Sequence, residues 1–145
     1  MLDINKEIKQ AMLSKDSVKL ASLRAVKSAV IMAQTEKGAG ELDEAGMQKI
    51  IQKQVKQRKD AAQIYIDQSR QDLADDELAQ VKILEQYLPK QMNESEIKTV
   101  VEEVISSVGA TSMADMGKVM GLVNQKLAGK ADGKIIAQIV KTTLA

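Results

Sequence analysis

The sequence predicts an all-α fold, made of an N-terminal helical bundle and a small C-terminal module of three helices. Apolar residues recur at steps of three and four almost throughout the 145 residues, which is the period of an amphipathic helix. The composition contains two tyrosines and no phenylalanine or tryptophan, and it is dominated by Leu, Ala, Gln, Lys, Glu and Met. These residue types lose little side-chain freedom in a helix, so composition and period agree.

Four helices are expected in the N-terminal bundle, over residues 3–14, 16–37, 43–69 and 72–87. Asp16 and Asp43 precede the second and third helices as N-cap residues, whose side chains can accept from free backbone amides. The Gly-Ala-Gly segment 38–40 is expected to end the second helix, and Pro89, the only proline, to end the fourth. The predicted inward-facing residues are Ile4, Ile8, Met12, Leu23, Val26, Val30, Ala33, Met47, Ile51, Val55, Ala62, Tyr65, Leu78, Val81, Leu84 and Leu88.

Three shorter helices are expected after the proline, over residues 93–109, 112–128 and 132–144. Asn93 and Glu96 have the spacing of a capping box, Ser112 and Asp115 have a similar spacing, and Asp132 is a third N-cap. The predicted inward-facing residues are Ile97, Val100, Val101, Val104, Ile105, Met116, Met120, Val123, Leu127, Ile136, Ile139, Val140 and Leu144. We therefore expect two domains, the bundle over residues 1–91 and the module over residues 92–145.

The composition excludes several classes of function. The chain has no cysteine and no histidine, so it lacks thiol nucleophiles, disulfides and the commonest zinc ligands. We expect no catalytic residue, no metal site and no cofactor. The charged first segment and the lack of an apolar run near 18 residues predict a cytoplasmic protein with no membrane partner. The net charge of +1 excludes nucleic-acid binding through bulk charge, so such binding must come from a local patch.

The basic run in the third helix is a candidate partner-binding site, formed by Lys56, Arg58 and Lys59. Lys56 falls on an outward face of the predicted helix. Arg58 falls instead within the apolar stripe, between Val55 and Ala62. An arginine at such a position either pairs with a buried carboxylate or faces a gap that a partner fills.

The second half of the module is a candidate nucleic-acid-binding site. Gly117 and Gly121 lie four residues apart in a predicted helix, so they form one smooth strip, although each glycine costs roughly 1 kcal/mol relative to alanine. Either a neighbouring helix or the backbone of a ligand approaches this strip closely. The other residues of the candidate site are Lys118, Lys126, Gly129, Lys130 and Lys134. The turn over residues 129–134 leads to the N-terminus of the last predicted helix, where free backbone amides favour an anion. Aromatic residues for base stacking are absent from this segment.

The chain resembles the GatB/YqeY family of helical proteins. The motifs that carry the resemblance are KQRKDA (Lys56–Ala61), LEQYLPKQM (Leu84–Met92), DMGKVMG (Asp115–Gly121) and GKADGK (Gly129–Lys134). The C-terminal module is also similar to the tail of the B subunit of the glutamyl-/aspartyl-tRNA amidotransferase, which helps to hold tRNA. That tail has an Asn-Pro pair where this chain has Asp132 and Gly133, and the added negative charge weakens the argument for phosphate at the turn.

The resemblance implies a non-catalytic accessory protein that binds tRNA or a tRNA-modifying or aminoacylation complex. The family label of carbon–nitrogen ligase with glutamine as amide donor describes the relatives, because this chain has no Gly-rich phosphate loop and no nucleophile motif. Two alternatives stay open. A helical adaptor would bind a protein partner through the N-terminal bundle, and an enzyme acting on an amide or carboxylate would need a deep pocket with paired carboxylates.

Overall fold

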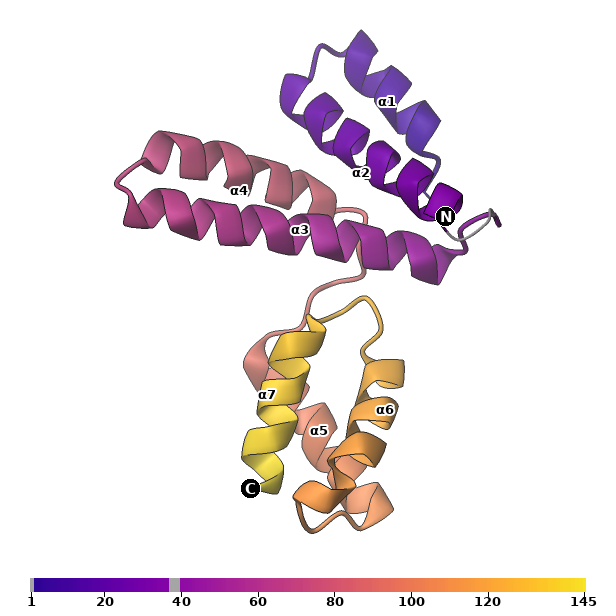
Figure 1. Ribbon diagram of the computed structural model, residues 1–145, viewed down its shortest axis with the longest axis vertical. Helices are drawn as coiled ribbons and strands as arrows, with labels where there is room; N and C mark the ends of the chain where they lie inside the picture. The colour runs from indigo at the N-terminus through magenta and orange to yellow at the C-terminus, as the bar shows by residue number, and fades with distance from the viewer. Residues whose placement is uncertain (1, 37–39) are drawn as a thin grey trace. The chain divides into compact units, whose positions relative to one another are not determined.

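The computed structural model describes residues 2–36 and 40–145, and the regular secondary structure of these residues is entirely helical, as predicted (Figure 1). The α-helices of this part of the chain are α1 (Ile4–Leu13), α2 (Ser17–Glu36), α3 (Glu44–Asp67), α4 (Gln71–Glu85), α5 (Glu94–Val108), α6 (Met116–Lys126) and α7 (Gly133–Leu144). They fall into two compact units, residues 1–89 and 90–145, here named unit 1 and unit 2. The boundary expected from the sequence lies after residue 91. The expected end of the second helix at residues 38 and 39 lies outside the described residues.

The N-caps predicted for unit 1 are confirmed. The Asp16 carboxylate accepts a hydrogen bond of 3.0 Å from the backbone amide of Lys19, at the start of α2. The Asp43 carboxylate accepts one of 2.7 Å from the amide of Gly46, at the start of α3. Both bonds satisfy amides that have no partner within the helix, which explains why the helices begin at these residues.

Local signals also define the ends of α5. The side chain of Asn93 accepts from the amide of Glu96 at 2.8 Å, and the Glu96 carboxylate accepts from the amide of Asn93 at 3.3 Å. This pair is the predicted capping box. Gly109 ends the helix in the left-handed conformation, with φ of 66°, which glycine adopts without steric cost.

Unit 1 buries a core between two helix pairs. In Figure 1, α1 lies beside α2, and α3 and α4 form an antiparallel hairpin; α2 contacts both α3 and α4. The buried apolar residues are Ala11, Leu23, Val26, Val30, Met47, Ile51, Val55, Ala62, Ala74, Val81 and Leu84. Most of the predicted inward stripe is therefore confirmed.

Two residues predicted to face inward in unit 1 are exposed. Met12 is 55% exposed and Leu78 is 40% exposed, while Ala11 and Ala74 are fully buried. Ala11 follows Ile4 by seven residues, which is two helical turns, and Ala74 precedes Val81 by the same interval. A small residue at these points lets neighbouring helices approach closely. The predictions for Met12 and Leu78 were therefore wrong, whereas those for Val81 and Leu84 are confirmed.

Unit 2 is a three-helix module with a core of its own. Helices α5, α6 and α7 contact one another. The buried core residues are Ile97, Val101, Val104, Val119, Val123, Leu127, Ala131, Ile136, Val140 and Leu144. The predicted helix start at Ser112 is corrected in part, because residues Met113–Asp115 form a 3₁₀ turn before α6 begins. The predicted cap of the last helix is confirmed, since Asp132 accepts from the amide of Lys134 at 3.0 Å.

Candidate nucleic-acid interface

The two glycines of α6 face open space. Gly117 and Gly121 are both exposed, and a Cβ atom added to either would meet no heavy atom within 4 Å. Close approach of a neighbouring helix of the same chain, one of the two predicted alternatives, is therefore wrong for the part of the chain that the structure describes. The helix carries the conformational cost of both glycines without a packing contact that offsets it.

The four lysines of the candidate site are all exposed. Lys118 follows Gly117 in α6, and Lys126 is the last residue of that helix. Lys130 lies in the turn, and Lys134 lies in the first turn of α7. Across residues 2–36 and 40–145, none of the four makes an ion pair. Their ammonium groups are free to bind an anion.

The carboxylates of this segment are engaged with the backbone. Asp115 accepts from the amide of Thr111 at 3.1 Å, and Asp132 accepts from the amide of Lys134. The second bond occupies one of the amides at the start of α7, so fewer of them are left for an anion than the sequence suggested. Anion binding at this turn stays a prediction.

Gly129 does not belong to the exposed surface. It is buried and adopts a φ of 76°, which glycine reaches without steric cost. Its carbonyl accepts a hydrogen bond of 2.7 Å from the Gln91 side chain, and the next carbonyl, of Lys130, accepts from the amide of Met92 at 2.9 Å. The assignment of Gly129 to the nucleic-acid surface is therefore corrected, since this glycine ties the turn to the start of unit 2.

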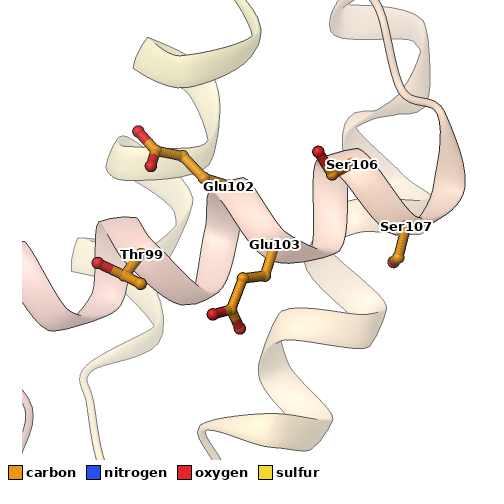
Figure 2. A pocket seen from close by; sticks show the side chains of 5 residues that line it. All are labelled: Thr99, Glu102, Glu103, Ser106 and Ser107. Atoms are coloured by element: carbon orange, nitrogen blue, oxygen red, sulfur yellow. The ribbon is translucent and has the colours of Figure 1, made fainter.

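The acidic side chains of α5 line a shallow hollow of about 530 Å³. Its lining residues are Thr99, Glu102, Glu103, Ser106 and Ser107, all on this one helix (Figure 2). Figure 2 shows the carboxylates of Glu102 and Glu103 pointing in different directions, as neighbouring residues of a helix do. These carboxylates do not converge on one point, so the hollow is not the deep pocket with paired carboxylates that the enzyme alternative calls for.

Residues 2–36 and 40–145 contain no cluster of three or more acidic side chains arranged to hold a metal ion. No helix among them is both long enough and apolar enough to cross a membrane.

The candidate partner-binding residues of unit 1 lie in three different environments. Lys56 is exposed. Lys59 forms an ion pair of 3.1 Å with Glu85 of α4. Arg58 is half-buried between α3 and α4, where its guanidinium donates to Gln80 Oε1 at 2.8 Å and to Gln54 Oε1 at 2.6 Å.

Arg58 corrects the first predicted alternative. Its Nε and Nη1 groups donate to the amide oxygens of Gln80 and Gln54 and to the Gln54 carbonyl, rather than to a buried carboxylate. The second alternative, a gap that a partner fills, stays a prediction. Burial lowers the pKa of Arg58, and the charge of Glu77 opposes that shift. The spacing Gln54–Arg58 is i, i+4 and could have been recognised in the sequence. The contact with Gln80 could not, because it depends on how α3 and α4 align.

Comparisons with known proteins agree with the resemblance seen in the motifs. A family model described as Yqey-like protein matches residues 2–144. Several relatives share the name Altered inheritance of mitochondria protein 41, mitochondrial. The Vanderwaltozyma polyspora protein is 30% identical over 122 residues, covering 80% of this chain and 66% of the relative. The Kluyveromyces lactis protein is 27% identical, covering 85% and 68%, and the Pyrenophora tritici-repentis protein is 30% identical, covering 86% and 69%. The chain spans about two thirds of the length of these relatives.

Proposed function

The chain belongs to the YqeY-like family of helical proteins, and from this premise we propose that it is a non-catalytic accessory protein that binds tRNA or a tRNA-containing complex. The similarity of unit 2 to the amidotransferase tail suggests the kind of partner. A cytoplasmic location is part of the proposal. The names of the relatives give a mitochondrial location, so cell fractionation would distinguish the two.

The observation that carries the proposal is the open glycine strip of α6 beside unpaired lysines. Gly117 and Gly121 allow a ligand backbone to reach the helix main chain without meeting a Cβ atom. Lys118 lies next to this strip, and Lys126, Lys130 and Lys134 continue from the end of α6 into α7. An ammonium group beside a smooth strip, with three more along the following segment, suits the phosphates of a nucleic-acid backbone.

The chemistry of the surface favours contact with phosphates over the reading of bases. The tyrosines of the chain, Tyr65 and Tyr87, both lie in unit 1, so unit 2 offers no aromatic ring for stacking. Few phosphates would be neutralised, so the isolated protein should bind weakly and depend on the fold of the RNA for its position.

A titration of fluorescent tRNA at several salt concentrations tests the proposal. If each of the four lysines meets one phosphate, the logarithm of the affinity should fall with the logarithm of salt with a slope of about 2 to 4. The double variant Lys118→Ala/Lys130→Ala should bind more weakly and lower that slope by about 2, with unchanged helix content by circular dichroism.

A matched control removes two exposed lysines from α3 of unit 1, as Lys49→Ala/Lys53→Ala. It changes the net charge equally and should leave the slope near that of the wild type. The proposal would be contradicted if tRNA binding by the wild type did not saturate at low salt. An equal loss of tRNA affinity in both double variants would also contradict it.

A further inference from the structure

Helix α2 carries a second, exposed face away from the core of unit 1. Residues 18, 21, 25, 28, 32 and 35 recur at alternating steps of three and four, which places them on one side of the helix. They are Val18, Ala21, Ala25, Ser28, Met32 and Thr35, and with Ile31 they are named the outer face of α2. The residues that α2 buries in the core, Leu23, Val26 and Val30, fall on a different side.

The outer face is largely apolar, and its residues are exposed except for the half-buried Ala25. Val18 is 38% exposed, Ile31 52% and Met32 61%. The hydroxyl of Thr35 donates to the carbonyl of Ile31 at 2.8 Å, so this polar group is satisfied by the helix itself. Exposed apolar side chains thus stand at both ends of the face, and exposed apolar surface on a helix is a candidate for interaction.

The charges along α2 are mostly positive. Its one carboxylate, on Glu36, follows Met32 by four residues and lies at the end of the outer face. Residues 17–35 contain no aspartate or glutamate, and their charged residues are Lys19, Arg24 and Lys27. Lys19 pairs with Glu7 at 3.1 Å. Arg24 and Lys27 are exposed and have no acidic partner within residues 2–36 and 40–145. A partner with carboxylates at the edge of its contact surface would therefore bind this face more tightly than one without them.

The shape of the outer face favours a helix as the occupant. Its middle is built from Ala21, Ala25 and Ser28, which allow two helix backbones to approach closely, and larger side chains stand at its ends. A membrane surface would instead favour bulky apolar side chains along the whole strip. A second copy packed antiparallel about Ala25 would bring Arg24 against the Arg24 of its partner, and this contact is repulsive.

We propose that the outer face of α2 docks a helix of another protein, whose apolar seam is flanked by glutamate or aspartate. This site is in unit 1 and is independent of the RNA surface proposed for unit 2. The two proposals therefore stand or fall separately.

Two designed peptides test the docking site. Both are helical, with the same seam of alanine and leucine; one carries glutamate along its flanks and the other carries lysine. At low salt the glutamate peptide should bind the full chain about tenfold more tightly than the lysine peptide. The double variant Arg24→Glu/Lys27→Glu should reverse this preference.

A matched pair of variants locates the contact. Met32→Glu should weaken binding of the glutamate peptide about tenfold, whereas Ile64→Glu, on α3, should leave it unchanged although Ile64 is 55% exposed. Absent binding, equal binding of both peptides, or equal loss in both variants would overturn the proposal. It would also be overturned if Met32→Glu abolished a dimer in sedimentation or binding to phosphatidylglycerol vesicles, since the occupant would then be a second copy or a membrane.

Discussion

The hydroxyl of Tyr87 donates a hydrogen bond of 2.9 Å to the carboxylate of Glu7, joining residues 80 positions apart in the chain. The same carboxylate oxygen pairs with Lys19 at 3.1 Å, so α1, α2 and the segment after α4 meet at one group. These two partners lower the pKa of Glu7. Burial raises the pKa of Tyr87, and the bond to Glu7 raises the pKa of Lys19.

The bond between Tyr87 and Glu7 should contribute to the stability of unit 1. Tyr87→Phe removes the hydroxyl and keeps the ring, so the free energy of unfolding should fall by about 1 kcal/mol. Tyr65→Phe is the matched control, because the Tyr65 hydroxyl has no hydrogen-bond partner in the described chain. Urea denaturation of the three proteins measures the difference. Equal effects of the two substitutions would show that the Tyr87 hydroxyl contributes nothing specific.

The lowered pKa of Glu7 predicts a loss of stability in acid. A carboxyl whose pKa is lower in the folded state stabilises the protein above its unfolded pKa, about 4.3, and the stabilisation is lost as pH falls through the folded value. Thermal unfolding of the wild type and Glu7→Gln should therefore differ most near neutral pH and converge as the pH falls through the lowered pKa of Glu7. A difference that stays constant with pH would refute this linkage.

The contacts of Arg58 with Gln54 and Gln80 should stabilise the α3–α4 hairpin. Arg58→Met keeps an apolar stem but removes the donors, so we expect a loss of about 1 kcal/mol in the free energy of unfolding. Arg58→Lys should lose nearly as much, since one ammonium cannot reproduce the planar fork. Lys56→Met, at an exposed position of the same helix, should change stability by less than about 0.5 kcal/mol. Chemical denaturation measures the free energies of unfolding, and a loss in Lys56→Met equal to that in the two Arg58 variants would contradict this role of Arg58.

The ends of α5 should be sensitive to single substitutions. Asn93→Ala removes one side of the capping box and should cost about 1 kcal/mol. Gly109→Ala forces alanine into the left-handed region and should cost about the same. Gln138→Ala, at an exposed position of α7, is the control. Hydrogen exchange of α5 amides should be faster in the first two variants only.

Features that depend on a few neighbouring residues could be predicted from the sequence. Asp16, Asp43, Asn93 and Asp132 cap helices because each acts within three residues of itself, and Gly109 ends α5 for a reason equally local. The helical period likewise separated most core residues from surface residues.

Features that depend on how helices align could not be predicted in the same way. Met12 fits the period of α1, but the approach of α2 selects Ala11 instead. The spacing of Gly117 and Gly121 places them on one side of α6 but does not reveal whether another helix covers them. The burial of Gly129 depends on Gln91, 38 residues away, which no local pattern indicates.

The glycine strip of α6 makes the most specific prediction about stability. Since an added Cβ meets open space at both positions, Gly117→Ala/Gly121→Ala should stabilise unit 2 by about 2 kcal/mol. The strip thus costs stability that a purely structural surface has no reason to give up. The proposal for RNA binding accounts for this cost by close contact with the sugar-phosphate backbone.

The affinity of this double variant for tRNA is the most direct test of the proposed function. Fluorescence anisotropy at low salt should show roughly fivefold weaker binding than the wild type, although the variant is more stable and has the same charge. Gly133→Ala, at another exposed glycine with open space around it, should bind as the wild type does. Binding by the double variant that equals that of the wild type would contradict the proposed contact at α6.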